Sequence, residues 1–235
     1  MSDTKSSAAK LHPAFKRLRT QKIDSLKVEV EEYVHLKTGA KHLHLASDND
    51  ENVFLVGLKT VPQDNTGVAH ILEHTALCGS ERFPVRDPFF MMIRRSLNTF
   101  MNAFTSSDWT AYPFASKNRK DFDNLLSVYL DSVFFSSLDR LDFAQEGHRL
   151  EFEETENADS NLTYKGVVYN EMKGAMSSPV SQLWQTLTKY VFPTSTYHFN
   201  SGGEPEHITD LSYDELIAFY KKHYHPNGRA KRRSV

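Results

Sequence analysis

The chain has 235 residues, of which 39% are hydrophobic and 25% are charged, and its formal net charge at pH 7 is −2. This balance lacks the strong basic bias that nucleic-acid and membrane-surface proteins show, and the apolar runs are too short to cross a bilayer. A single cysteine, Cys78, excludes an internal disulfide framework and favours a reducing compartment. We therefore expect no nucleic-acid partner and no membrane partner.

We expect no targeting signal in the N-terminal region. Residues 1–11 are polar and rich in serine, alanine and lysine, without the apolar stretch of a secretory signal or the arginine content of a mitochondrial presequence. We expect a disordered tail there, followed by an entry segment over residues 13–26.

A β-hairpin is predicted next. Apolar and charged residues alternate over residues 26–36, residues 38–40 have turn composition, and the alternation resumes over residues 42–45. His42 and His44 share one face of the return strand and could hold a metal. Because no third ligand accompanies them, we interpret this face as the solvated face of an edge strand.

Residues 52–60 are apolar and rich in β-formers, which predicts a central strand. A loop dense in helix breakers follows at residues 61–67. A helix is expected from about Gly67 to Leu77, with Gly79 as its C-terminal stop.

A second helix is expected after residues 83–87, because Asp87 and Pro88 have the composition of an N-cap and a first helical turn. Its apolar side chains are assigned to the core; they are Phe89, Phe90, Met91, Met92, Ile93 and Leu97. Two antiparallel strands, residues 99–104 and 108–115, are predicted beyond it.

The remaining chain is predicted to be mainly helical. Helices are expected at residues 118–135, 143–154 (alternatively a helix-to-strand passage), 162–176 and 183–191 and from Asp210 onward, with loops at 156–161 and 199–205. The paired glycines at 202 and 203 lack the strand and lysine of a phosphate-binding loop. These elements predict an α+β fold, with a mainly antiparallel sheet and helices packed on one face.

One motif carries chemistry. His70 and His74 are four residues apart, so that on a helix both imidazoles lie on one face and can reach one metal ion. Glu73 lies between them on the same side, in the H-x-x-E-H order of the inverted zinc-peptidase motif. The alternative is a helix with two surface histidines.

A catalytic zinc ion needs three protein ligands and an open position for water. The available carboxylates are Glu146, Glu151, Glu153, Glu154 and Glu171. Spacing alone does not choose among them, although a glutamate in an apolar helical stretch, such as Glu171, needs a partner. The chemistry would be metal-assisted hydrolysis, with Glu73 taking the proton of the attacking water.

Sequence blocks in register from about residue 12 to 227 resemble the presequence-protease branch of the pitrilysin/insulinase metallopeptidases. The blocks are residues 54–60, 66–74, 77–80, 83–89, 97–105, 112–113, 145–147, 165–174, 200–205 and 223–226. The resemblance implies a pitrilysin-like metallopeptidase domain that binds Zn²⁺ and acts on peptides.

The resemblance also implies roles for individual residues. His70 and His74 match the two zinc histidines, Glu73 matches the catalytic base, and Glu171 matches the distal zinc ligand. Tyr164 stands where other branches carry a further acid, so we assign it no such role.

A further implied site is the strand that pairs with extended substrate. Asn102, Ala103 and Phe104 match the family segment that lines the cleft, which would bind peptides by strand addition.

The resemblance gives a domain assignment: a disordered tail at residues 1–11, an N-terminal zinc-peptidase domain at 12–226, and a basic tail outside the family at 227–235. Family members carry several such domains, so a C-terminal truncation, a frameshift or a fragmentary gene model is the simplest account. An unpaired sheet edge and exposed apolar faces are then expected.

We therefore expect a zinc-dependent endopeptidase, or the N-terminal fragment of one, that hydrolyses short unstructured peptides. The alternatives are a non-catalytic zinc-binding or assembly fragment and a structural domain with incidental histidines. The isolated chain is expected to bind zinc with little or no peptidase activity. The expected location is the cytoplasm, with the mitochondrial matrix as alternative, and Cys78 is expected to be a small buried side chain rather than a reactive thiol.

Overall fold

The computed structural model describes residues 11–226. The tails expected at residues 1–11 and 227–235 lie outside this range, apart from Leu11. The chain divides into two compact units, of which the first runs to Asp50 and includes Pro226, while the second comprises residues 51–225. Each unit is described by itself, and the single domain expected over residues 12–226 stays a prediction.

The first unit is a three-stranded antiparallel sheet in the order β1-β2-β3. Its strands are β1 (Phe15–Ile23), β2 (Val28–His35) and β3 (Lys41–Ala46), with a short 3₁₀ turn, η1 (Asp24–Leu26), between the first two. The hairpin β2–β3 is confirmed, but the entry segment expected over residues 13–26 is wrong, because most of it is strand β1. Nearly all of β1 is exposed, so it lacks the alternation that reveals a strand, and pairing with β2 holds it.

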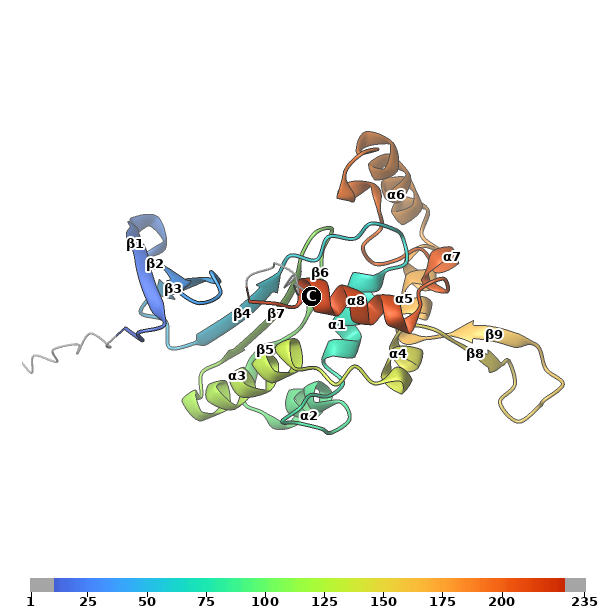
Figure 1. Ribbon diagram of the computed structural model, residues 1–235, viewed down its shortest axis with the longest axis horizontal. Helices are drawn as coiled ribbons and strands as arrows, with labels where there is room; N and C mark the ends of the chain where they lie inside the picture. The colour runs from blue at the N-terminus through green and yellow to red at the C-terminus, as the bar shows by residue number, and fades with distance from the viewer. Residues whose placement is uncertain (1–10, 227–235) are drawn as a thin grey trace, which may run out of the picture. The chain divides into compact units, whose positions relative to one another are not determined.

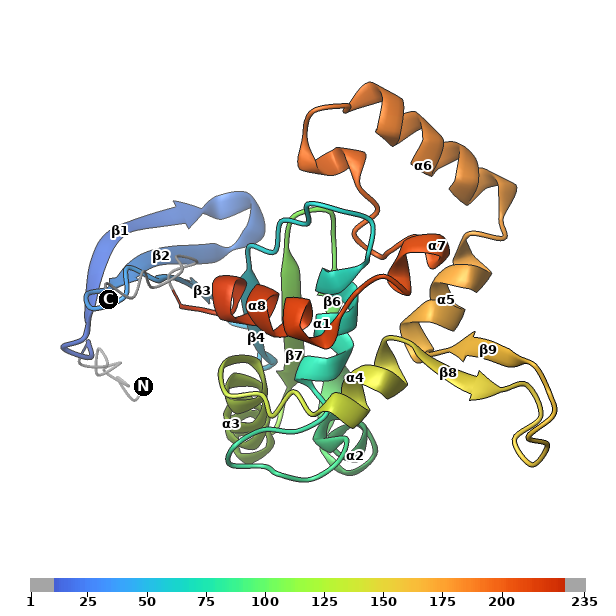
Figure 2. The same ribbon diagram turned by 45° about the vertical axis from the view of Figure 1, so that its right-hand side comes forward.

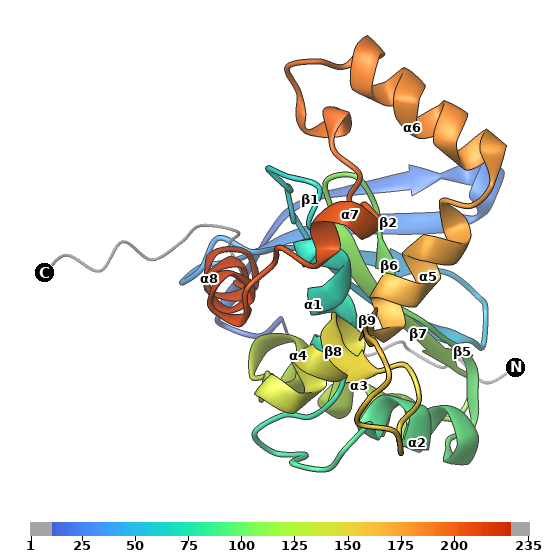
Figure 3. The ribbon, with the colours of Figure 1, turned by 90° about the vertical axis from the view of Figure 1, so that its right-hand side faces the viewer.

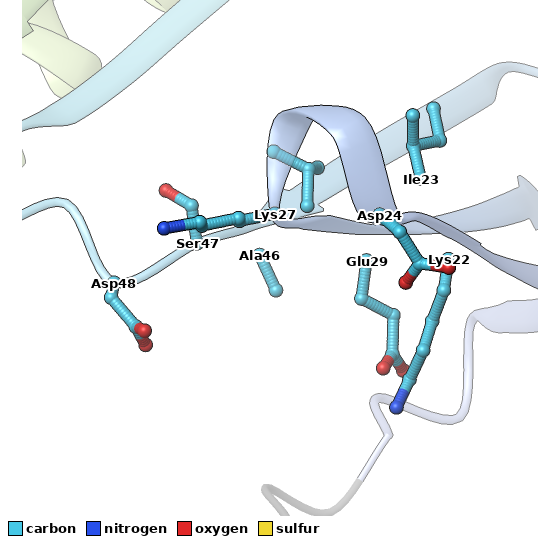
Figure 4. A pocket seen from close by; sticks show the side chains of 9 residues that line it. Lys22, Ile23, Asp24, Lys27, Glu29, Ala46, Ser47 and Asp48 are labelled. Atoms are coloured by element: carbon cyan, nitrogen blue, oxygen red, sulfur yellow. The ribbon is translucent and has the colours of Figure 1, made fainter.

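An open hollow of about 450 Å³ lies at the turn end of this sheet (Figure 4). Lys22, Asp24, Lys27 and Glu29 line it together with Asp48. Cationic and anionic side chains therefore mix around an open space, and the hollow favours no ligand charge.

The second unit is built on a sheet in the order β4-β7-β5, with β6 also paired to β7 (Figure 1). The strands, all antiparallel, are β4 (Asn52–Leu58), β5 (Asn98–Met101), β6 (Phe104–Thr105) and β7 (Thr110–Ser116). The central strand is β7, which is buried along its whole length, and the prediction that residues 52–60 are central is wrong. Strand β4 is apolar on both faces, yet Val53 and Leu55 are exposed on the face away from the core.

The second unit also contains the helices α1 (Val68–Ala76), α2 (Pro88–Arg95), α3 (Arg119–Phe134), α4 (Arg140–Glu146), α5 (Val167–Ala175), α6 (Pro179–Val191), α7 (Pro205–Ile208) and α8 (Tyr213–His223), with a 3₁₀ turn, η2 (Thr196–His198). Helix α1 contacts β6 and helix α3 contacts β4 and β7, whereas α6 has no buried residue. A hairpin of β8 (Arg149–Phe152) and β9 (Leu162–Lys165) extends from α4 and α5 (Figures 1 and 2). The predicted α+β fold with a mainly antiparallel sheet is confirmed.

Helix α1 lies at the centre of the second unit, in contact with α4, α8 and β6 (Figure 2). Its Ile71 and Leu72 have no exposed surface, and neither has Phe114 of β7, which belongs to the same core cluster. The Phe114 ring packs against Tyr129 of α3 at a centroid distance of 4.8 Å. One side of α1 is thus fully buried, which leaves its polar side as the part that can form a site.

Two expected helices contain a strand. The stretch 162–176 begins as β9 and turns helical only at Val167, and the stretch 143–154 divides into α4 and β8. Gly166 separates β9 from α5, and a Cβ there would lie 2.0 Å from the Gly147 carbonyl oxygen. This close backbone approach needs glycine and forces the change of direction, which the apolar periodicity does not reveal.

Helix α2 differs from its prediction in two ways. Asp87 precedes it with a left-handed φ of 55° and no side-chain cap hydrogen bond. The core assignment of its apolar residues is also wrong for Phe90, Met91, Ile93 and Leu97, which are 41–65% exposed, whereas Phe89 and Met92 pack against the core.

Other helix ends are set by different residues than expected. Helix α1 ends at Ala76, and Gly79 is not its stop. Helix α8 begins after Ser212 rather than at Asp210, because Ser212 and Glu215 form a reciprocal capping box. Within residues 11–226, no helix has the length and apolar character needed to cross a membrane.

Replacing Leu72 by alanine should lower the free energy of unfolding by about 2–5 kcal/mol, because the cavity forms in the fully buried centre of the second unit. Urea unfolding followed by circular dichroism measures the change. The same substitution at Leu141, a helical residue that is 79% exposed, should have an effect within about 0.5 kcal/mol. Equal effects at the two positions would contradict the position of α1 in the core.

Cys78 is buried, with 7% of its surface exposed, as expected for a small packed side chain. Burial raises the pKa of its thiol well above the usual value, and the nearby charges of Glu146, Asp142 and Asp87 add to this effect. Since the thiolate is the reactive form, alkylation by iodoacetamide at pH 7.5 should be at least about tenfold slower in the folded chain than in urea. Equal rates in the two conditions would show that the thiol is accessible in the native state.

Candidate metal centre

Two imidazoles and one carboxylate meet at the polar side of α1. His70 and His74, one helical turn apart, have ring centroids separated by 5.0 Å. Glu171 comes from α5, which runs beside α1 (Figure 3). Its Oε2 lies 3.7 Å from Nε2 of His70 and 3.8 Å from Nε2 of His74. The three residues form the one group among residues 11–226 whose ligand atoms lie close enough together to hold a metal ion.

The donor set and its spacing fit zinc. Ligand atoms at about 2.1 Å from a tetrahedral zinc ion lie roughly 3.4 Å apart. The two nitrogen-to-oxygen distances exceed that value by only a few tenths of an ångström. Two histidines and one glutamate are also a ligand set of catalytic zinc sites, which keep a fourth position open. The Glu171 side chain is 53% exposed, so solvent can reach this position.

The other ring nitrogen of each histidine, Nδ1, forms a hydrogen bond with a group outside α1. Nδ1 of His70 donates to the carbonyl oxygen of Gly202 at 3.0 Å, and Nδ1 of His74 lies 3.1 Å from Oε2 of Glu146. A carbonyl or carboxylate oxygen only accepts, so each imidazole carries its proton on Nδ1 and keeps the Nε2 lone pair for a ligand. Such partners orient metal-binding histidines and raise their basicity.

The pair of His74 and Glu146 is an electrostatic unit. Burial disfavours the charged form of His74, but the hydrogen bond that His74 donates to Glu146 and the negative charges of Glu73, Glu146 and Glu171 outweigh this effect and raise the pKa of His74. Burial likewise opposes the charge of Glu146, and the hydrogen bonds from His74 and Gln145 overcome it and lower its pKa. The negative charges that surround His74 favour a cation at this site.

The loop of residues 200–203 packs against the start of α1. Gly67 precedes the helix with a φ of 68°, and a Cβ on it would lie 2.7 Å from the Gly202 oxygen and 2.8 Å from the Gly203 Cα. Gly203 itself has a φ of 97°. Because Gly67 and Gly203 have no side chains, the backbone of the loop packs directly against the start of α1, and the Gly202 carbonyl lies within hydrogen-bond distance of His70.

Glu73 lies on α1 between the two histidines and is 8% exposed. Its Oε2 accepts a hydrogen bond of 2.5 Å from the hydroxyl of Thr105 on β6. A carboxylate on the same face as two imidazoles that could hold a metal ion can accept a proton from a water molecule at the open position.

The other sequence candidates lie elsewhere. Glu151, on β8, forms ion pairs with Arg149 and Lys165, and Glu153 and Glu154 are exposed. His42 and His44, on β3 of the first unit, belong to no three-residue metal group within residues 11–226.

The segment expected to bind substrate lies beside the motif helix. Asn102 and Ala103 connect β5 to β6, and Phe104 begins β6, which contacts α1. The backbone N–H of Asn102 donates to the Pro113 oxygen at 3.2 Å, so the segment is anchored to β7.

Sequence reasoning missed three of these contacts. Glu146 was one of five candidate ligands, yet it bonds the far nitrogen of His74. Gly202 acts through its backbone carbonyl, a group that every residue type carries, so the sequence gives no signal for this contact. Thr105 was not among the predicted site residues. All three residues lie in segments that resemble the family, namely residues 97–105, 145–147 and 200–205. Their contacts with Glu73, His74 and His70 join residues far apart in the chain, so helix or strand periodicity does not predict them.

The chain is similar to known proteins in sequence and in fold. The model of the insulinase family, peptidase family M16, matches residues 53–179. A mitochondrial presequence protease of Eremothecium gossypii is 51% identical over 223 residues, which are 95% of this chain and 22% of that protein. A mitochondrial presequence protease of Danio rerio is 56% identical over 194 residues, 83% of this chain and 19% of that protein.

The crystal structure of pitrilysin has the same fold, with a TM-score of 0.67 over 91% of this chain and 22% of that one, at 19% sequence identity. The chain thus spans about a fifth of the length of the curated relatives that it matches. The family model covers the two histidines, Glu73 and Glu171 together with most of the sheet that supports them. The chain belongs to the insulinase family of peptidases, peptidase family M16.

Proposed function

We propose that this chain is the zinc-binding part of an endopeptidase that hydrolyses bonds in short unstructured peptides. The observation that carries the proposal is the meeting of His70, His74 and Glu171, with Nε2 and Oε2 atoms 3.7 and 3.8 Å apart, around a side of α1 that also bears Glu73. Membership of a peptidase family supports the same conclusion.

In this mechanism His70, His74 and Glu171 hold the metal. Zinc, when bound, polarises the scissile carbonyl and makes a water molecule acidic. Glu73 takes the proton of the attacking water and delivers it to the leaving amine. Glu146 and Gly202 accept hydrogen bonds from the two Nδ1 atoms and so keep both Nε2 atoms turned toward Glu171, where they would be available to hold zinc beside Glu73.

The substrate would bind as an added strand along residues 102–104. In the described chain β5 and β6 pair with β7 alone, so their outer edge has free backbone groups. An extended peptide can use these groups whatever its side chains, which favours unfolded substrates. Since β6 contacts α1, a peptide on this edge would pass next to Glu73.

The main alternative is a zinc-binding or assembly fragment without catalysis. A scaffold needs the three ligands but has no use for a buried carboxylate such as Glu73 that faces the same site. The presence of the base therefore favours the peptidase.

The relatives support the mitochondrial alternative for the cellular location rather than the cytoplasm, which was the location expected from the sequence. Those reported above are named as mitochondrial. We propose the mitochondrial matrix, the alternative weighed from the sequence, as the site of action.

The purified chain should bind one zinc ion per molecule, which elemental analysis after dialysis measures. His74→Ala should abolish the binding because it removes one of three ligands, and Glu73→Gln should leave it unchanged because Glu73 is not a ligand. His207→Ala, at an exposed histidine of α7, is the matched control and should also retain the metal. Zinc retained by His74→Ala at full occupancy would contradict the site.

The isolated chain should show little or no cleavage of a fluorescently labelled unstructured peptide, because Glu171 is half exposed and nothing in the described residues closes over the site to exclude water. A longer protein that carries the regions present in the relatives should cleave the peptide, and Glu73→Gln should abolish that activity. Cleavage by the 235-residue chain itself, lost in Glu73→Gln, would overturn the first expectation but support the mechanism.

A further inference from the structure

The proposed base has a hydrogen-bond partner that neither its motif nor its metal accounts for. Oγ1 of Thr105 lies 2.5 Å from Oε2 of Glu73, at the short end of the range for a hydroxyl bonded to a carboxylate. An ionised carboxylate can only accept, so the hydroxyl of Thr105 donates. The bond therefore fixes the direction of that hydroxyl and the position of one carboxylate oxygen.

Buried hydroxyls lie behind this contact. Thr105 on β6 is directly opposite Thr110 on β7, and their hydroxyl oxygens are 3.5 Å apart. Thr110 bonds in turn to Thr60 at 2.7 Å, and neither Thr60 nor Thr110 has any exposed surface. The partner of Glu73 is therefore set in the sheet, next to groups that cannot move into solvent.

The two oxygens of Glu73 are not equivalent. Oε2 is occupied by Thr105, whereas Oε1 has no hydrogen bond within residues 11–226. We propose that Thr105 is a positioning residue, which holds Oε2 so that Oε1 is the oxygen that faces the metal side and accepts the proton of the attacking water. This inference rests on the proposed peptidase function.

Strand stability alone does not require this hydroxyl. A valine at position 105 would serve the same strand, since β-branched residues are favoured there whether or not they carry an oxygen. Replacement by valine removes the contact to Glu73 at nearly constant side-chain shape. Serine keeps the hydroxyl and loses a methyl group, which makes it the rescue variant.

The contact itself can be tested on the zinc-free chain. A hydroxyl proton held by a carboxylate exchanges slowly enough to be detected by NMR through coupling to its own β-carbon. We expect this signal for Thr105 in the wild-type chain and its loss in Glu73→Ala. A missing signal in the wild type, or one that persists in Glu73→Ala, would overturn the inference.

The positioning role is tested on the zinc-loaded chain with acetohydroxamic acid, whose acidic group needs an acceptor beside the metal. Thr105→Val should weaken binding about tenfold, as expected for one hydrogen bond to a charged group, and Thr105→Ser should restore it. In a Glu73→Gln background, Thr105→Val should change affinity by less than about twofold. Thr75→Val, which removes a buried hydroxyl bonded to the Ile71 carbonyl on the same helix, is the matched control and should have no effect.

The outcomes separate the two proposals. A wild-type chain that holds no zinc overturns the proposed function together with this inference. If zinc is bound but the affinity is unchanged in Thr105→Val, or is lowered equally with and without Glu73, the inference alone fails. A zinc-loaded wild type that does not bind the hydroxamate would also contradict the assignment of Oε1 to the metal side.

Discussion

The structure of the second unit depends on how α1 is divided between two environments. Ile71 and Leu72 have no exposed surface and belong to the core cluster that also includes residues of the sheet, α3 and α8, whereas the residues on either side of them, His70 and Glu73, turn toward the site. Burial of the apolar side fixes the rotation of the helix about its axis. A small rotation would move both imidazoles and the carboxylate together, so packing in the core determines the chemistry at the surface.

The side chains on the polar side of α1 are oriented by hydrogen bonds to segments that are distant in sequence. Glu146 follows His74 by 72 residues and Gly202 follows His70 by 132, yet each reaches the Nδ1 atom of its ring. Thr105, on strand β6 of the sheet, donates a hydrogen bond to Glu73. Three separate elements thus hold three side chains of one helical turn, and each does so with a single hydrogen bond.

The sequence predicted what local periodicity encodes. The alternation of β2 and β3, the apolar face of α3 and the pairing of His70 with His74 on one helix all follow from spacings of two to four residues. What depends on tertiary contacts was missed: β1 has almost no buried residue to reveal it, and the apolar residues of α2 are half exposed despite their composition. Among five carboxylates, periodicity could not separate the proposed ligand Glu171 from Glu146, because the position of each depends on how α4 and α5 pack against α1.

The long reach of the Gly202 contact has a consequence for synthesis of the chain. At about 5–20 residues per second, the 132 residues between His70 and Gly202 correspond to roughly 7–26 seconds of translation. During that interval the ring of His70 lacks the acceptor that fixes its tautomer, and Glu171 is added only near the end. The contact that holds His70, and the approach of Glu171 to it, can therefore form only after most of the second unit has been made, so the proposed metal site is completed late in synthesis.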